Sequence, residues 1–371
     1  MATSRAWTFT ARGAPRSVLS LTPRPVPTLP PAAAVVSKSK DSSEWLSIKV
    51  AYAALNPGGH FYVSMIPAAA RAKTAVPEMD LSGVVADVWT PSASSSATGA
   101  RFRKGDRVAA FIPVSFGWAT GTGALAEHVV LPAKYAVAVP RGVGLKGAGS
   151  VLTAGCTALT TVRAAGLKKG GRVLVNGASG GVGSLAVQMA RDAVGPEGVV
   201  VAVCSGRNAE MVRGLGADEV VDYTATGRVS DVLRERFGVE KRFDGVVDCI
   251  GVQDVYASCA AYVVPGGVYA AVGIKPAAQT WGSFFKAVWT MQMNAVWPLA
   301  EWLGGVGRVW KGTTMMDPGR TLMEDVVGML ADGRVKAVFD REVAMENVVE
   351  GYDIVESGRA RGKVIVKVGE E

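Results

Sequence analysis

The sequence is short of the residues that bind metal ions and form disulfides. Its 371 residues include only two histidines, His60 and His128, and four cysteines that lie far apart without a CxxC pair. We expect no secretory signal peptide ahead of them. We therefore expect a reducing compartment, the cytoplasm, and no disulfide framework. The four cysteines are Cys156, Cys204, Cys249 and Cys259.

The N-terminal segment is basic and has no acidic residue before Asp41. This composition also occurs in transit peptides, so a mitochondrial location is the alternative. The stretch AWTFTARG, however, alternates like a strand, and PRSVLSLTPRPVPTLP reads as a second strand with a proline-rich connection. We favour a folded segment.

Long hydrophobic runs and concentrated positive charge are both missing. The formal charge is +8 and the pI about 9.3, but Lys and Arg are scattered, so we expect no nucleic-acid partner. The aromatic-rich region 281–310 is interrupted by Lys286, Pro298 and Glu301, which excludes a transmembrane helix there. With 49% apolar residues, the chain can bury two domain cores.

The spacing of apolar runs changes once along the chain. From Leu46 to about Pro140, short apolar runs alternate with turn residues, which is typical of a mostly β domain. From Gly171, strands without polar alternation are separated by helix-like segments, as in a parallel sheet covered on both faces. The closing stretch 336–368 reads strand, helix, strand, and is compatible with a return to the β domain. The fold class is therefore α/β.

The stretch VLVNGASGGVGSLAVQMA, residues 173–190, joins an expected strand to an expected helix through a glycine-rich turn. A triphosphate loop would need Lys followed by Ser or Thr after the last glycine, but Gly183 is followed by Ser184 and Leu185. The order fits a dinucleotide diphosphate instead, and hydride transfer becomes the leading chemistry. Gly180 would admit the diphosphate and Gly183 would permit close helix packing, with backbone donors from Ser179, Gly181 and Val182.

The tip of the next strand, in VVVAVCSGRNAE, lacks the Asp or Glu that binds the ribose hydroxyls of NAD. Arg207 offers a permanently charged fork suited to phosphate, although a solvated loop charge would look the same. We therefore predict NADPH, with its 2′-phosphate near Ser205, Arg207 and Asn208.

Six motifs in this order resemble the medium-chain dehydrogenase/reductase superfamily, and more narrowly the fungal-type members of its zinc-free quinone oxidoreductase-like branch. They are AALNP at 53–57, KGDRV at 104–108, LTAGCTALTTV at 152–162, GASGGVG at 177–183, GADEVVDY at 216–223 and SGRARGKVIVKV at 357–368. The resemblance implies a GroES-like, mostly β domain and a Rossmann doubly wound parallel-sheet domain. The expected boundaries are 1–145, completed by 325–371, and 146–324.

The resemblance also implies site residues. Tyr223 matches a position that contacts the 2′-phosphate, and the nicotinamide side is lined by Thr157, Gly251, Gly273 and Lys363. Gly251 and Gly273 would also suit plain turns, and Lys363 a surface charge. In the cleft, Asn56 would donate a hydrogen bond to the substrate, or else serve as a turn residue before Pro57.

The proton donor is less defined. Related enoyl reductases use a tyrosine in the segment after this asparagine, and Tyr62 is the nearest candidate. The segment NPGGHFYV departs from the NPxD form usual in the branch, and Phe61 would equally suit a position facing the cleft. Water or the 2′-hydroxyl of the cofactor are alternative donors.

Neither zinc-ligand set of the zinc-dependent relatives is present. The chain reads ALNPGG and PEMDLSGVV where ligands would stand, and we expect no metal site. Without a Lewis acid, hydride transfer needs an electrophilic small molecule, a quinone or an α,β-unsaturated carbonyl. The alternative is an NADPH-binding partner protein with little turnover. We also expect a homodimer formed through the edge of the Rossmann sheet, with a contact near Phe284, Phe285, Val288 and Trp289.

Overall fold

The computed structural model describes residues 2–29, 44–90, 101–225, 227–296 and 301–370. The chain forms two units, each with its own core. The β-rich unit consists of Met1–Thr153, Met316–Gly333 and Phe339–Glu371. The Rossmann unit consists of Ala154–Met315 and Arg334–Val338. Helix α5 (Leu145–Ala165) belongs in part to each unit.

The β-rich unit is built on a seven-stranded sheet with the order β14-β15-β3-β4-β5-β7, in which β6 also pairs with β3. All pairs are antiparallel except β14 with β15. The closing stretch of the chain therefore returns to this unit. The strands are β3 (Trp45–Leu55), β4 (Asp80–Trp89), β5 (Arg107–Phe111), β6 (His128–Pro132), β7 (Ala136–Ala138), β14 (Phe339–Ala344) and β15 (Lys363–Lys367).

The N-terminal segment is folded onto itself. Strands β1 (Thr3–Thr8) and β2 (Ser20–Pro25) form an antiparallel two-stranded sheet, so the two strands expected there are present. A short helix, α1 (Pro15–Val18), precedes the second strand where the sequence suggested only extended chain. Pro15 stands at the start of that helix, where its fixed φ is compatible with the first turn.

The other helices of the β-rich unit are α3 (Pro57–Met65), α4 (Val114–Thr120), α11 (Gly319–Ala331) and α12 (Val348–Glu356). Helix α3 begins directly after β3, because Pro57 occupies its first position and Asn56 its N-cap. Helix α12 packs on α3 and on β15. This packing brings the C-terminal part of the chain beside the segment around Asn56.

The Rossmann unit contains a six-stranded parallel sheet with the order β10-β9-β8-β11-β12-β13. The strand order reverses between β8 and β11, and ligands of such sheets bind at the carboxyl ends of the strands on either side of that point. The strands are β8 (Arg172–Asn176), β9 (Val199–Cys204), β10 (Glu219–Asp222), β11 (Phe243–Asp248), β12 (Val263–Ala271) and β13 (Val309–Gly312).

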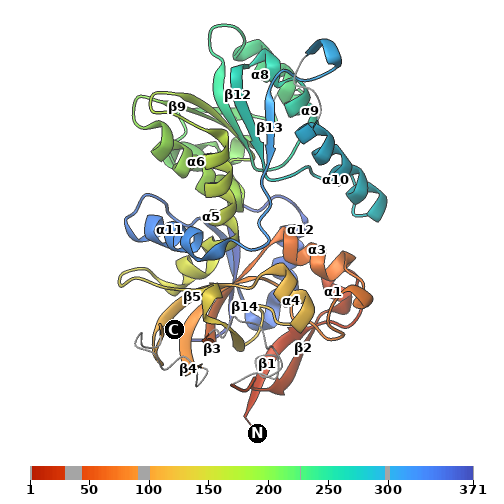
Figure 1. Ribbon diagram of the computed structural model, residues 1–371, viewed down its shortest axis with the longest axis vertical. Coiled ribbons are helices and arrows are strands. Elements are labelled where there is room, and N and C mark those ends of the chain that lie inside the picture. The colour runs from red at the N-terminus through yellow and green to blue at the C-terminus, as the bar shows by residue number, and fades with distance from the viewer. Residues whose placement is uncertain (1, 30–43, 91–100, 226, 297–300, 371) are drawn as a thin grey trace. The chain divides into compact units, whose positions relative to one another are not determined.

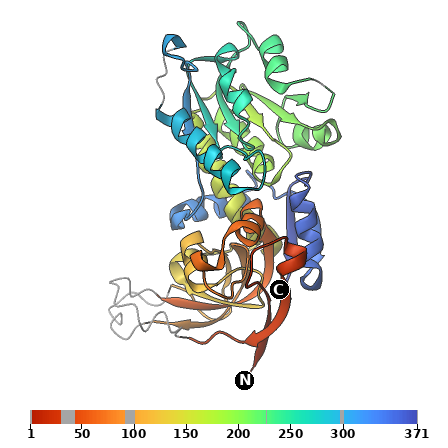
Figure 2. The same cartoon turned by 90° about the vertical axis from the view of Figure 1, so that its right-hand side faces the viewer.

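Helices cover both faces of this sheet (Figures 1 and 2). They are α6 (Gly181–Val194), α7 (Ala209–Gly214), α8 (Val229–Arg236), α9 (Gln253–Ala257) and α10 (Trp281–Val296). Strands without polar alternation are buried on both faces, as the sequence predicted. The GroES-like and Rossmann architectures expected from the sequence are confirmed. No helix in the described part of the chain has the length and apolarity needed to cross a membrane.

Helix α10 exposes much of its aromatic content. Phe285 is 62% and Trp289 65% exposed, while Ala287 is the residue buried against the unit. Strand β13, against which α10 packs, is an edge strand of the sheet. The apolar stripe predicted from the sequence is therefore a real surface of the Rossmann unit.

Candidate functional site

The glycine turn after β8 has the geometry of a phosphate cradle. Gly177 has a φ of +75°, and a Cβ on Gly183 would lie 2.0 Å from the Gly177 carbonyl oxygen, so helix α6 packs closely on the turn. A Cβ on Gly180 would have its nearest neighbour 3.8 Å away, which leaves room for a ligand. Gly181 and Val182 open the helix, where backbone N–H groups have no acceptor within the helix. These residues fit a dinucleotide diphosphate.

The tip of β9 lies beside this turn. The Asn208 side-chain amide donates to the Ser179 hydroxyl at 3.0 Å and to the Ser205 hydroxyl at 3.1 Å. The structure thus brings together three residues that the sequence assigned to the cofactor. Arg207 lies next to them and is exposed, and Tyr223 is 49% exposed at the end of the neighbouring strand.

Sequence reasoning missed a carboxylate at this tip. A Cβ on Gly206 would lie 2.2 Å from Asp222 Oδ2, so the carboxylate sits directly on the tip backbone. Hydrogen bonds from the side chain and backbone of Thr224, and from the Gly206 N–H, lower the pKa of Asp222. The signal was available, since the last Asp of GADEVVDY ends the strand adjacent to the tip. Any phosphate bound there would feel this negative charge together with the positive charge of Arg207.

A second carboxylate organises the loop after β11. Asp248 is fully buried, and its Oδ1 accepts the N–H groups of Ile250 and Gly251 at 2.9 Å each. It also accepts hydrogen bonds from the side chains of Asn176 and Tyr269. The loop is thereby tied to β8 and β12, on both sides of the strand that carries it.

This arrangement places two predicted glycines together. Gly251 and Gly273 have φ values of +81° and +131°, and a Cβ on Gly251 would meet the Gly273 carbonyl oxygen at 2.2 Å. Both glycines are therefore required by the backbone itself, whatever their contact with a cofactor. Thr157 is buried on α5 of the same unit.

In the β-rich unit, Asn56 and Lys363 are in direct contact. The Lys363 Nζ donates to Asn56 Oδ1 at 2.6 Å and to the Leu55 carbonyl oxygen at 3.2 Å. Lys363 is 5% exposed, which makes it a buried cation rather than a surface charge. Although Asn56 is the N-cap of α3, its side chain makes no capping hydrogen bond with that helix. The amide is instead used inside a buried polar cluster.

Two carboxylates complete that cluster. Asp80 lies 3.7 Å from the Lys363 Nζ, and its other oxygen accepts the backbone N–H and the hydroxyl of Thr153. Glu78 Oε1 accepts the Asn56 backbone N–H at 3.1 Å and the Tyr352 hydroxyl at 2.8 Å, and Oε2 accepts the Asn56 Nδ2 at 3.0 Å.

Burial controls the titration of this cluster. It raises the pKa of Glu78 to about 7, against the opposing effects of the Asn56 and Tyr352 hydrogen bonds and of the Lys363 charge. Burial likewise raises the pKa of Asp80 and lowers the pKa of Lys363, while their mutual attraction opposes both changes. Sequence reasoning assigned no role to Glu78, although it stands in the quoted motif PEMDLSGVV.

Tyr62 does not join these hydrogen bonds. Its ring stacks on Trp118 at 5.7 Å between centroids and meets Phe9 edge-on at 5.2 Å. Its buried hydroxyl has no hydrogen-bond partner among the described residues, and burial raises its pKa to about 12. Tyr62 is therefore protonated at neutral pH, as a proton donor must be.

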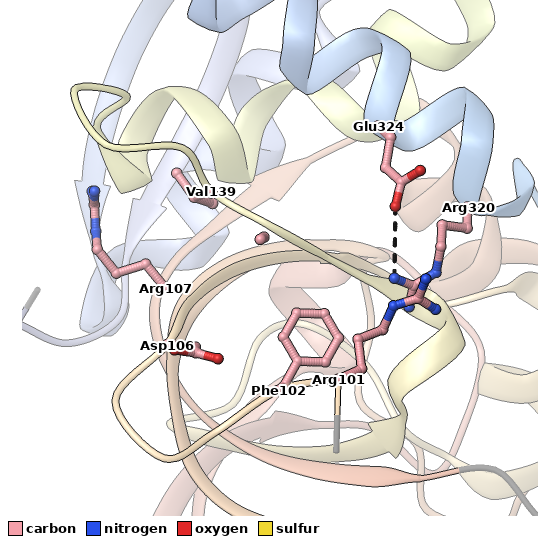
Figure 3. A pocket seen from close by; sticks show the side chains of 8 residues that line it. Arg101, Phe102, Asp106, Arg107, Val139, Arg320 and Glu324 are labelled. Atoms are coloured by element: carbon pink, nitrogen blue, oxygen red, sulfur yellow. Dashed lines mark ion pairs between the residues drawn. The ribbon is translucent and has the colours of Figure 1, made fainter. Parts of the chain in front are cut away.

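No group of three or more His, Cys, Asp or Glu side chains that could hold a metal ion occurs among the described residues. A cavity of about 300 Å³ in the β-rich unit contains none of the predicted site residues (Figure 3). Arg320 forms an ion pair with Glu324 at its wall. The cavity is lined by Arg101, Phe102, Asp106, Arg107, Ala138, Val139, Arg320 and Glu324.

Comparison with known proteins agrees with this architecture. The profile of the alcohol dehydrogenase GroES-like domain matches residues 42–141, and that of the zinc-binding dehydrogenase family matches residues 215–366. The chain is 33% identical to the medium chain reductase pydE of Acremonium sp., over 99% of each chain. It is 29% identical to the trans-enoyl reductase poxH of Penicillium oxalicum, over 100% of this chain and 99% of that protein.

Among solved structures, the quinone oxidoreductase from Coxiella burnetii superposes with a TM-score of 0.71 at 21% identity, over 99% of this chain and 100% of that one. That likeness shows the shared fold. The identity and coverage of the curated relatives extend it to the family, in agreement with the resemblance found in the sequence motifs. The chain therefore belongs to the medium-chain dehydrogenase/reductase superfamily and is an oxidoreductase.

Proposed function

We propose that this protein uses NADPH to reduce α,β-unsaturated carbonyl compounds or quinones without a metal ion. The observation that carries this proposal is the buried Lys363–Asn56 hydrogen bond, at 2.6 Å. It polarises a buried amide, whose N–H groups could donate to the oxyanion that develops when a conjugated acceptor receives a hydride. The relative poxH is named a trans-enoyl reductase, which belongs to the first of these two acceptor classes.

The Rossmann unit would hold the cofactor, which supplies the hydride when bound. Ser179, Gly180, Gly181, Val182 and Gly183 would bind the diphosphate at the start of α6. Thr157, Gly251 and Gly273 would line the nicotinamide side, and Ser205, Arg207, Asn208 and Tyr223 would bind the 2′-phosphate.

The preference for NADPH rests on Arg207, because a planar guanidinium binds a phosphate through two hydrogen bonds. Asp222 opposes it, since its carboxylate lies on the Gly206 backbone. Arg207 must therefore compensate for this repulsion as well as attract the phosphate.

Asn56 would act on the substrate through its amide hydrogens. The charged Lys363 polarises the amide by donating to Oδ1, which makes the Nδ2 hydrogens stronger donors. These two hydrogens have three acceptors within 3.3 Å: the Ala54 carbonyl, Glu78 and Asp80. Binding a substrate oxygen thus requires the exchange of one bond, and the longest of the three, to Asp80 at 3.3 Å, is the easiest to give up.

The proposed metal independence is supported by the partners of the two carboxylates, which already accept hydrogen bonds or face a lysine. Asp80 faces the Lys363 ammonium and two donors of Thr153, and Glu78 accepts from Asn56 and Tyr352. A metal cation placed on these carboxylates would be repelled by Lys363 and would break these bonds. Tyr62 stays the proposed proton donor, because its protonated hydroxyl is not committed to another described residue.

Steady-state NADPH oxidation with a panel of enones, quinones and saturated ketones tests the proposal. We expect turnover with the conjugated acceptors only, at the same rate before and after dialysis against a chelator. Loss of activity on chelation that zinc restores would refute the metal-free chemistry.

A second candidate is an NADPH-binding partner protein, favoured by the exposed aromatic side chains of α10 and by Trp302, which is 83% exposed. Tight NADPH binding with no turnover of any acceptor would select this alternative. The exposed side of α10, which packs against edge strand β13, supports our proposal of a homodimer.

A further inference from the structure

Glu78 combines an unfavourable backbone conformation with an unfavourable environment for its side chain. Its φ of +72° makes it the only non-glycine residue with a positive φ in the described part of the chain. Its carboxyl group is fully buried, with 3% of the residue exposed. Residues other than glycine adopt this conformation rarely, and buried carboxylates need partners. Both features point to a specific role for this side chain.

The hydrogen bonds of Glu78 reproduce a capping box from a distant part of the chain. In a capping box, the side chain at the third helical position accepts the backbone N–H of the N-cap residue. In α3 the N-cap is Asn56 and the third position is Gly59, which has no side chain. Glu78 Oε1 accepts the Asn56 N–H instead, at 3.1 Å, and Oε2 accepts the Asn56 Nδ2 at 3.0 Å.

Gly59 and the Glu78 carboxyl group compete for one volume. A Cβ on Gly59 would lie 2.0 Å from Oε1, 2.3 Å from Cδ and 2.6 Å from Oε2 of Glu78, and no other residue supplies a nearer atom. The carboxyl group could not yield without breaking its bonds to Asn56 and Tyr352. The glycine at position 59 is therefore matched to the glutamate at position 78.

Glu78 also determines which way the Asn56 amide points. The carboxylates of Glu78 and Asp80 accept from Nδ2, while the Lys363 ammonium donates to Oδ1. A flipped amide would place its oxygen against two carboxylates and its NH₂ group against the ammonium. Electrostatics thus hold the amide in one orientation, with Lys363 on one side and the acids on the other.

We propose that Glu78 is a positioning residue for Asn56, and that it supplies, from before β4, the carboxylate that a capping box would carry at the position of Gly59. The catalytic part of this inference rests on the function proposed above for Asn56. The other part, that the Glu78 carboxylate takes the place of a carboxylate at position 59, concerns the folded structure alone. It can be tested by stability measurements, without an enzyme assay.

Five variants separate the need for space from the need for charge: Gly59→Ala, Gly59→Asp, Glu78→Gly, and the Glu78→Gly protein with either Ala or Asp at position 59. Glu78→Gly suits the positive φ, so the backbone tolerates it. We expect it to lower kcat about ten- to a hundredfold because Asn56 loses two hydrogen bonds, with the KM for NADPH changed less than about twofold.

The two double variants show whether Asn56 needs a carboxylate or only the space that Glu78 fills. Gly59→Asp with Glu78→Gly should recover most of the wild-type kcat, since a carboxylate again reaches the Asn56 N–H. Gly59→Ala with Glu78→Gly should fit sterically but stay slow, because it has no carboxylate. Gly58→Ala is the matched control, since its Cβ would meet only the Met79 Cε at an ordinary 3.4 Å.

The pH profile of kcat separates positioning from a purely structural role. The groups that face Glu78 are Asn56, Tyr352 on α12, and Lys363 on β15, with Asp80 beyond the Asn56 amide. Burial raises the pKa of Glu78 to about 7, so wild-type kcat should fall as Glu78 is protonated below about pH 7. The Glu78→Gly variant should lose this dependence.

The positioning role is overturned if Glu78→Gly keeps the wild-type kcat and pH profile, or if Asp at position 59 restores no more activity than Ala. Should the wild-type protein reduce no acceptor at all, the proposed function and the positioning role fail together. Thermal midpoints then still test whether the two positions share one carboxylate. That inference is wrong if Gly59→Asp lowers the thermal midpoint of the Glu78→Gly protein as much as it lowers that of wild type.

Discussion

The titration of Glu78 should be visible in the stability of the whole chain. Its pKa is about 7 in the folded protein and 4.5 ordinarily, because burial disfavours the charged form. A raised folded-state pKa means that the native state binds the proton more tightly than the unfolded state. The stabilisation from Glu78 is therefore complete below about pH 4.5, falls as the pH rises toward 7, and is absent above it.

The expected magnitude follows from the difference of about 2.5 pH units, at about 1.4 kcal/mol for each unit. Over the full range, ionisation of Glu78 lowers the free energy of unfolding by roughly 3 kcal/mol, most of it between pH 5 and pH 8. Glu78→Gln removes the titration. It also replaces an acceptor of Asn56 Nδ2 by a donor, which subtracts about 1–3 kcal/mol at every pH.

Urea unfolding of wild type and Glu78→Gln between pH 5 and pH 8 measures this effect. The free energy of unfolding of wild type should fall by roughly 2–3 kcal/mol more than that of the variant over this range. Glu350→Gln, at an exposed position on α12, is the control and should follow wild type. Parallel pH profiles for wild type and Glu78→Gln would refute the reasoning, because the carboxyl group would then titrate alike in both states.

Three further predictions concern the cofactor, the proton donor and the assembly. Arg207→Ala should raise the KM for NADPH about ten- to a hundredfold and leave that for NADH nearly unchanged, as steady-state kinetics would show. Tyr62→Phe should lower kcat while keeping or raising the thermal midpoint, because it removes a buried hydroxyl without a described hydrogen-bond partner. Light scattering at micromolar concentration should give a dimeric mass, and Trp289→Ser should shift it toward the monomer.

A specific result would contradict each of these three predictions. Arg213→Ala, at another exposed arginine of the same region, should leave both cofactors unaffected. If Arg207→Ala raises the KM for NADPH and for NADH equally, Arg207 does not bind the 2′-phosphate. An unchanged kcat in Tyr62→Phe would transfer proton donation to water or to the cofactor. A monomeric wild-type protein would exclude the predicted dimer.

Local patterns in the sequence were sufficient to predict the fold class and the glycine turn. Strands buried on both faces must be apolar throughout, so the parallel sheet was visible as uninterrupted apolar runs between helices. The turn after β8 was visible because only glycine permits the approach of α6 at Gly183 and leaves the space at Gly180. Because these requirements concern residues of a single strand–turn–helix unit, they can be recognised in a short stretch of sequence.

Partners that come from distant segments were decided by the tertiary structure. Asn56, Glu78, Tyr352 and Lys363 meet because β3 pairs with both β4 and β15 while α12 packs on α3. No local periodicity encodes that meeting, and the sequence alone left Asn56 open as a turn residue and Lys363 as a surface charge. The glutamate at position 78 acquires its raised pKa and its bonds to Asn56 only once these strands are in register, since burial and hydrogen bonding are properties of the assembled cluster.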